Sequence, residues 1–194
     1  MQPDGATHQA DPQPPQESPK HGHLRLSVRT SDQLFNSFDP SPFYEKDLDA
    51  AAEQFLVSWA GELHPHADLR LTLYLKTPPA QPDPERWLAQ AIHHNFAERA
   101  RLARAELRAL LRLGRASLAV GVAFLVSCLL LAQSVGTLTT GVVPHVLGEG
   151  LTIVGWVAMW RPLQIYLYDW WPLLQKQRLY ARMSRMPVEL RITA

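Results

Sequence analysis

The chain has 194 residues, of which 46% are hydrophobic, and its 19 Lys and Arg nearly balance its 18 Asp and Glu. This balance conceals a strong asymmetry of charge along the sequence, and we predict no nucleic-acid partner. The single cysteine, Cys128, excludes an intrachain disulfide and a cysteine-based metal site. Because it lies in a long apolar run, we interpret it as a small packing residue.

Residues 1–22 are rich in proline, glutamine and other polar residues, with few apolar side chains to bury. This composition predicts a disordered tail. The segment contains no apolar stretch of the kind found in secretory signal peptides, so no cleavable signal is expected. We therefore expect a cytoplasmic N-terminus.

Residues 23–82 are predicted to form a strand–helix–strand domain. Apolar residues alternate from Leu24 to Val28 and again from Leu69 to Leu75, which indicates two half-buried strands. The order strand, helix, strand predicts a crossover that makes the two strands parallel.

Between these strands, Pro40 and Pro42 indicate a loop, and either Asp47 or Asp49 is expected to cap the helix that follows. Apolar residues then recur at helical spacing, which predicts one stripe packed on the sheet. The stripe consists of Leu48, Ala52, Phe55, Leu56, Trp59 and Leu63.

Residues 83–114 are predicted to form a basic amphipathic helix that leads into the membrane. Its apolar residues repeat near the helical period, and no breaker separates it from the next segment, so we expect one continuous rod. The apolar positions are Trp87, Ala91, Ile92, Phe96, Ala103, Leu107, Leu110 and Leu111, and the basic ones are Arg86, Arg99, Arg101, Arg104, Arg108 and Arg112.

Residues 115–162 are predicted to form a transmembrane hairpin. The first span, about 116–135, carries no formal charge, and roughly 20 helical residues match a hydrocarbon core of about 30 Å. The second span, about 143–161, starts near Pro144, and its Trp156 and Trp160 suit the interfacial aromatic belt. A buried helix of a soluble core is the alternative, although such helices usually have a polar face.

The distribution of basic residues predicts the orientation of this hairpin. Lys and Arg are concentrated before the first span and after the second, whereas the loop 136–148 has none, so both termini are expected in the cytoplasm. Small residues in both spans predict close helix packing. They are Ser117, Ala119, Gly121 and Ala123 in the first span and Gly148, Thr152 and Gly155 in the second.

Residues 163–186 are predicted to form an interfacial segment of aromatic and basic residues. Pro162 is expected to break or kink the helix, Arg161, Trp170 and Trp171 to lie at the membrane interface, and Pro172 to start a short basic helix. Residues 187–194 are predicted to form a last strand that completes the cytoplasmic sheet. The predicted fold class is therefore an α+β membrane protein with a two-helix transmembrane hairpin.

Two long segments carry a resemblance to known proteins: LFNSFDPSPFYEKDLDAAAEQFLVSWA, and EGLTIVGWVAMWRPLQIYLYDWWPLLQKQRLYARM. Together they resemble a family of small, functionally uncharacterised bacterial membrane proteins that pair these segments around a hairpin. The resemblance covers most of the chain beyond the tail. It implies this architecture and a bacterial inner (cytoplasmic) membrane, but no catalytic residue.

Glu149 is the most informative polar residue, because a charge at the bilayer centre costs about 2.5–3.5 kcal/mol and usually has a partner or a task. His145 lies one turn earlier on the same face of the predicted helix. One interpretation is a candidate intramembrane proton or ion site formed by the two. The other is an anchor about one turn into the span, favoured by the helix dipole.

Other polar clusters have weaker signals. An acidic run could bind a divalent cation, but its spacing matches no calcium loop, and helix capping explains part of it. Neither His64 with His66 nor His93 with His94 has zinc-site spacing, so we expect them to be exposed or locally bonded. The run consists of Asp39, Glu45, Asp47, Asp49 and Glu53.

The sequence contains no phosphate-binding glycine loop, no nucleophile elbow and no metalloprotease motif, so we predict no enzyme activity, cofactor or metal. The preferred function is a membrane-anchored interaction or scaffold module with an unidentified membrane or cytoplasmic partner. The alternative is a homo-oligomeric channel or transporter component with Glu149 facing the pore. A third class, an enzyme acting on lipid headgroups, lacks a visible site.

Overall fold

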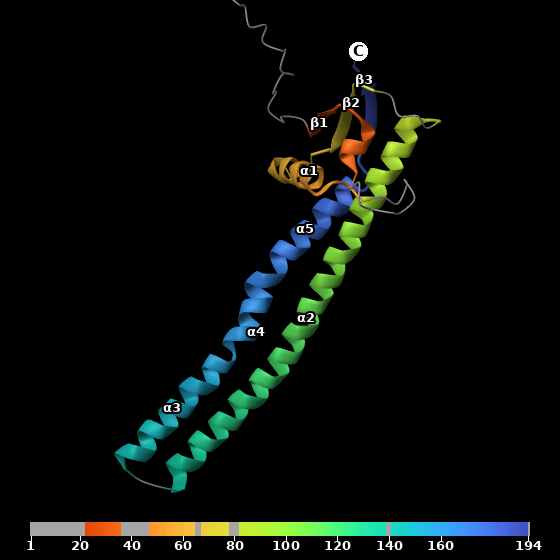
Figure 1. Ribbon diagram of the computed structural model, residues 1–194. Helices are drawn as coiled ribbons and strands as arrows, with labels where there is room; N and C mark the ends of the chain where they lie inside the picture. The colour runs from red at the N-terminus through yellow and green to blue at the C-terminus, as the bar shows by residue number, and fades with distance from the viewer. Residues whose placement is uncertain (1–21, 36–46, 65–66, 78–81, 139–140, 194) are drawn as a thin grey trace, which may run out of the picture.

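The structure is a computed structural model that describes residues 22–35, 47–64, 67–77, 82–138 and 141–193. A small α+β head lies at one end of a long helical hairpin (Figure 1). The head contains a three-stranded sheet, the helix α1 (Ala50–Glu62) and the nearby ends of the hairpin helices. The predicted loop around Pro40 and Pro42 lies outside the described residues.

The sheet consists of β1 (His23–Val28), β2 (Arg70–Leu75) and β3 (Val188–Ile192) in the order β1-β2-β3. Both pairs of neighbouring strands are parallel. The predicted crossover unit is therefore confirmed, and so is the prediction that the last strand joins the sheet. Because β2 is central, both of its edges are hydrogen-bonded to neighbouring strands. The strand β3 follows the whole hairpin in the sequence.

One face of the sheet forms the core of the head. The strand register aligns three apolar rows, which α1, α2 and α5 cover with residues that include Leu56, Phe96 and Met183. Ile192 is the exception, because it remains 58% exposed at the end of its row. The rows are Leu24–Leu71–Val188, Leu26–Leu73–Leu190 and Val28–Leu75–Ile192.

Asp49, rather than Asp47, caps α1. Its carboxylate accepts hydrogen bonds from the backbone N–H groups of Ala51 and Ala52, at 2.9 and 3.3 Å, which satisfies two donors that the first helical turn leaves unpaired. The predicted apolar stripe is partly wrong, because Phe55 is exposed, with its ring tilted against that of Trp59 at a centroid distance of 4.4 Å. The face that α1 buries contains Glu53, Leu56 and Ala60.

The hairpin has two arms. The first arm is the single helix α2 (Pro84–Leu138), whose 55 residues extend about 80 Å at 1.5 Å per residue. This confirms the predicted continuous rod. The second arm runs back along α2 as α3 (Val142–Ala158), α4 (Trp160–Gln164), the π-helix η2 (Ile165–Asp169) and α5 (Trp170–Met183).

Two prolines explain the irregularities of the second arm. Pro162 has no N–H to donate to Ala158 O, and the helix is interrupted at Met159, three residues before the position where the sequence predicted the kink. Pro172 likewise cannot bond Tyr168 O, and η2 precedes it. The arm therefore remains helical but changes direction locally.

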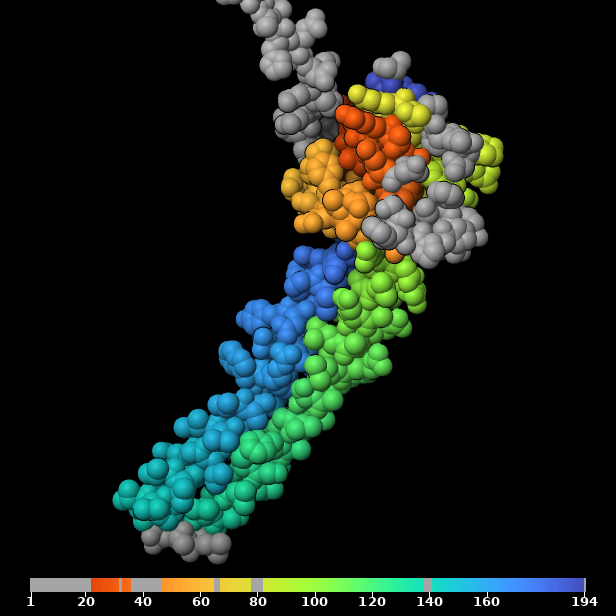
Figure 2. All heavy atoms as spheres, in the orientation of Figure 1, coloured from red at the N-terminus to blue at the C-terminus, as the bar shows by residue number. Residues whose placement is uncertain are grey.

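Two helices in the described residues are long and apolar enough to cross a membrane, within Pro84–Thr137 and Val142–Met183. Only 11% and 6% of their most apolar windows are buried in the chain, which argues against two core helices of a soluble fold. On the face seen in Figure 2, none of the described residues outside the hairpin covers its apolar part. Insertion into a bilayer itself stays a prediction.

Candidate functional site

The predicted pair His145 and Glu149 comes together near the tip of the hairpin. Both lie on α3, and His145 Nε2 is 3.2 Å from Glu149 Oε1. Their side chains are 75% and 65% exposed. They line an open hollow of about 460 Å³ between α3 and the end of α2, together with Ala132, Gly136, Pro144, Gly148, Thr152 and Ile153.

The imidazole nitrogen and the carboxylate oxygen of this pair lie within ion-pairing distance of each other. In the part of the chain that the structure describes, no group of three His, Cys, Asp or Glu side chains could hold a metal ion. Glu149 lies seven residues into α3, or about 10 Å along its axis. It is therefore about two turns from the tip, deeper than the one turn that the sequence suggested.

Small residues form the seam between the two arms, as predicted. A Cβ at Gly155 would lie 2.9 Å from Leu125 Cδ1 and 3.1 Å from Cys128 Cβ, and one at Gly121 would lie 3.2 Å from Ala158 O. Cys128 is buried, in agreement with its interpretation as a packing residue. Because glycine has no side chain, α2 and α3 can approach this closely at Gly121 and Gly155.

The seam also differs from the prediction at three positions. Ala119 and Ala123 are exposed and face away from α3. Gly114, which sequence reasoning missed, is buried, and a Cβ there would lie 2.9 Å from Ile165 Cγ2. The seven-residue spacing of Gly114, Gly121 and Cys128 was the available signal, because this is the period at which one helix faces another.

The residues predicted for the membrane interface lie along the second arm. Arg161 Nη1 donates to Asp169 Oδ2 at 3.3 Å. Trp170 packs edge-on against Trp171, with ring centroids 5.5 Å apart. The side chains of Trp156, Trp160 and Trp171 are exposed on the surface of the chain. Their contact with lipid headgroups stays a prediction.

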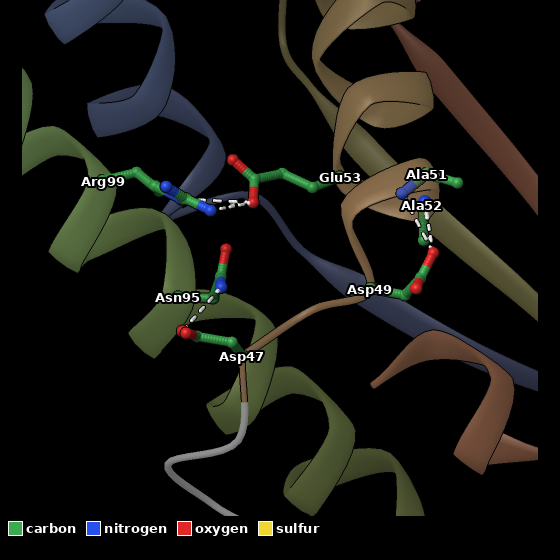
Figure 3. A network of polar contacts seen from close by, with 7 residues as sticks. All are labelled: Asp47, Asp49, Ala51, Ala52, Glu53, Asn95 and Arg99. Carbon is green, nitrogen blue, oxygen red and sulfur yellow. Dashed lines mark hydrogen bonds and ion pairs between the residues drawn. The ribbon is translucent and has the colours of Figure 1, made fainter. Parts of the chain in front are cut away.

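A polar joint connects the head to α2 (Figure 3). We define it as Asp47, Glu53, Asn95 and Arg99. Arg99 donates to Glu53 Oε2 from Nε at 3.1 Å and from Nη2 at 2.6 Å, and Asn95 Nδ2 donates to Asp47 Oδ1 at 3.4 Å. Asp47 and Glu53 belong to the acidic run that could bind a divalent cation, but their hydrogen-bond partners here are side chains of α2. The joint therefore fixes α1 and the segment before it on the first arm.

His93 makes a second connection between α2 and the head. His93 Nε2 is 2.7 Å from Met186 O, which ties α2 to the turn before β3. The expectation of an exposed or locally bonded histidine is wrong for His93, whose partner is 93 residues away, whereas His64 and His94 are exposed as expected. Together with the joint, this contact couples the orientation of the head to that of the rod.

Substitution of Arg99 by Gln is expected to lower the free energy of unfolding of the head by about 2 kcal/mol, because the Glu53 carboxylate would be left without its cation. The Glu53 side chain is 11% exposed and that of Arg99 is 42% exposed. This partial exposure keeps the cost below the roughly 3–5 kcal/mol of a fully buried ion pair. Chemical denaturation followed by tryptophan fluorescence measures the change.

Arg101→Gln is the matched control, since Arg101 pairs with Glu98 on the exposed side of the same helix. The Arg101 guanidinium lowers the pKa of the Glu98 carboxyl through their hydrogen bond, but solvent screens this pair, whose side chains are 70% and 42% exposed. We expect no measurable change in stability. Equal effects of the two substitutions would contradict a structural role specific to the joint.

Fold and site define a class: an α+β head on a helical hairpin with two helices long and apolar enough to cross a membrane. Comparisons with family models, curated proteins and solved structures found no match. The resemblance to a bacterial membrane-protein family therefore stays a prediction that rests on the two sequence segments.

Proposed function

We propose that this chain is an integral protein of a bacterial inner membrane that acts as a membrane-anchored interaction or scaffold module. In this proposal the hairpin spans the bilayer twice, and the head lies in the cytoplasm with both termini. A partner protein docks on the head. The proposal assigns the chain no catalytic step.

The observation that carries the proposal is that the hairpin itself connects β2 to β3. In most parallel crossovers the connection is one helix packed on the sheet, whereas here only the near ends of α2 and α5 pack on the sheet and the rest of the two antiparallel arms extends away from it (Figure 1). The head cannot move away from the hairpin without losing a strand. This connectivity suits a head that stays attached to a membrane anchor.

The length of α2 supports a fixed spacing between head and bilayer. The core of the head includes α2 residues as far as Ala103, and the predicted span starts at about Ala116. Ala116 lies 13 positions after Ala103, which corresponds to about 20 Å along the helix axis. Because α2 is continuous across this distance, the proposed anchor holds the head at a defined height above the lipid headgroups, within reach of soluble or membrane partners.

Charge distribution supports the orientation. The exposed residues Arg104, Arg108 and Arg112 lie on α2 before the proposed span, whereas the tip of the hairpin has no Lys or Arg. Basic residues near span ends are retained on the cytoplasmic side. In this proposal the head therefore lies inside the cell and the tip outside.

A labelling experiment tests this topology. Single cysteines at Val142, exposed at the start of α3, and at Glu62, exposed at the end of α1, are introduced into a Cys128→Ala background. We expect a membrane-impermeant maleimide to label Val142→Cys in spheroplasts and to label Glu62→Cys only after lysis. Labelling in the reverse pattern would contradict the orientation, and recovery of the protein in the soluble fraction would contradict the anchor.

The second candidate function, a homo-oligomeric channel or transporter component, is favoured by one observation. His145 and Glu149 face a hollow instead of being buried, and intramembrane ionisable residues commonly mark proton or ion pathways. Two spans cannot enclose a pore alone. A native mass measurement in detergent that finds one chain per particle would exclude this candidate, whereas a closed ring of subunits would favour it.

A further inference from the structure

A groove runs along the hairpin between α2 and the second arm, apart from the hollow near the tip. Its volume is about 540 Å³, and it is open along one side. Val120 and Phe124, which are 70% and 45% exposed, line it on α2. Ala158 and Pro162 line it on the second arm, where it ends beside α4, part way between the head and the tip (Figure 1). The groove therefore reaches the end of the predicted spans that lies nearer the head.

The groove exists because the residues at its floor are small. Gly121 is buried there, and a Cβ at this position would lie 3.2 Å from Ala158 O and 3.5 Å from Pro162 Cγ. Ala158 adds only a methyl group, and the regular helix is interrupted next to it, at Met159. An apolar groove of this shape can accommodate an acyl chain by van der Waals contact along its length.

Two charged residues follow the groove in the direction of the head. Arg161 lines its end, and Asp169 comes eight residues later on the same arm, which runs from the tip to the head. Arg161 Nη1 donates to Asp169 Oδ2 at 3.3 Å, and the two side chains are 53% and 28% exposed. A guanidinium has five N–H donors and a carboxylate accepts several hydrogen bonds, so this contact leaves both groups able to bind a ligand. The order along the arm is therefore apolar groove, cation, anion.

We propose that the groove and this ion pair bind one phospholipid whose headgroup ends in a primary ammonium group, as in phosphatidylethanolamine. Its acyl chain lies along Val120 and Phe124, its phosphate binds Arg161, and its ammonium group binds Asp169. This inference rests on the proposed function, because the hairpin meets phospholipids only when it is inserted in a bilayer. It assigns a lipid ligand to the anchor.

The order of chemical groups in this lipid matches the order along the arm. Guanidinium groups bind phosphate oxygens through charge-assisted hydrogen bonds, and an ammonium group offers three N–H donors to a carboxylate. The groove extends from Ala116 to Phe124, which is about 12 Å along the helix axis and most of the roughly 15 Å of hydrocarbon in one leaflet. Basic pockets between transmembrane helices on the cytoplasmic side bind lipid headgroups in this way.

Charge and shape favour this lipid over other occupants. The Asp169 carboxylate repels an anionic headgroup, and a choline headgroup has no N–H group to donate to it. A transmembrane helix of a partner would need small residues for a close approach. Gly121, the glycine of the groove, is already covered by the second arm. An apolar helix would also make no use of the ion pair at the end of the groove.

The test reconstitutes the full-length protein into phosphatidylcholine vesicles that contain a minor fraction of phosphatidylethanolamine with a photoactivatable diazirine in one acyl chain. Irradiation and peptide mapping then locate the crosslinks. Val122 is exposed at the same depth as the groove but on the opposite side of α2, since two residues are about 200° apart. We expect labelling of Val120 and Phe124 to exceed that of Val122 at least fivefold. Equal labelling on both sides, or equal enrichment of a matched photoactivatable phosphatidylglycerol, would overturn the proposal.

Substitutions at the ion pair test the headgroup contacts. Arg161→Gln is expected to reduce the enrichment of phosphatidylethanolamine at least fivefold, because the phosphate loses its cation. Asp169→Asn should also reduce it but should increase the labelling by phosphatidylglycerol, since it removes the repulsion of an anion. A purely structural role of the pair would not reverse the lipid preference. Arg115 is exposed and lies outside the groove lining, so Arg115→Gln is the matched control and should stay within twofold of the wild type. Equal losses in Arg115→Gln and Arg161→Gln would refute a specific site.

Val120→Trp fills the groove with an indole ring and should abolish the preferential labelling of Phe124, whereas Val122→Trp adds the same ring on the opposite side and should preserve it. Labelling that survives Val120→Trp would contradict the groove as the site. Flotation of the vesicles separates this inference from the proposed function. A protein that floats with the vesicles without preferential labelling keeps its anchor and refutes the lipid site alone. A protein that stays out of the vesicles refutes the anchor, and the site, which requires a bilayer, falls with it.

Discussion

Deletion of residues 187–194 is expected to lower the free energy of unfolding of the head by about 4 kcal/mol, since it removes β3 and exposes the neighbouring rows of β2. Val188 is buried and Leu190 half-buried against the core. The backbone bonds from Leu71 N to Pro187 O and from Thr193 N to Leu75 O, both 2.9 Å, are lost with the strand. Two parallel strands alone are marginal in water.

Limited proteolysis with chymotrypsin measures this effect, because opening of the head exposes the backbone near Trp59. Cleavage there should be fast in the truncated protein and slow in the full chain. Ile192→Ala is the control: its side chain is already 58% exposed, so stability should change by no more than about 0.5 kcal/mol. A truncated protein that resists cleavage as well as the full chain would contradict the role of β3.

Replacement of Gly155 by Leu is expected to separate the two arms and to destabilise the hairpin by about 1–3 kcal/mol, the usual cost of overpacking a close contact. Even a single Cβ at this position would lie 2.9 Å from Leu125 Cδ1. A leucine adds three more carbons where α2 leaves no space. At about 2–4 °C per kcal/mol for a chain of this size, the midpoint of thermal unfolding in detergent should fall by several degrees.

Gly150→Leu provides a control on the same helix, because a Cβ at Gly150 would have no heavy atom within 4 Å. It adds the same apolar volume and removes the same glycine flexibility without meeting α2. Its unfolding midpoint should equal or exceed that of the wild type, since leucine favours helix more than glycine does. A similar loss in both variants would show that glycine at 155 is not required by the contact between the arms.

Local patterns determined most of the secondary structure. The alternation around Leu26 and Leu73, the helical run after Asp49 and the charge-free stretch after Arg115 each depend on neighbours a few residues away, and each predicted element is present. The last strand was also predictable, because its alternating residues would otherwise lie in water. Periodicity is a local property, so the sequence alone suffices for such features.

The positions of individual side chains on those elements were decided by tertiary contacts. Glu53 is buried in place of Phe55 because Arg99, 46 residues away, supplies its partner. Gly114 belongs to the seam only because Ile165 returns to it along the second arm. The three-stranded sheet likewise depends on strands whose register is set across the whole hairpin. Contacts between residues far apart in sequence leave no periodic signal, so only the folded chain shows which side chains pair and which helix residues face each other.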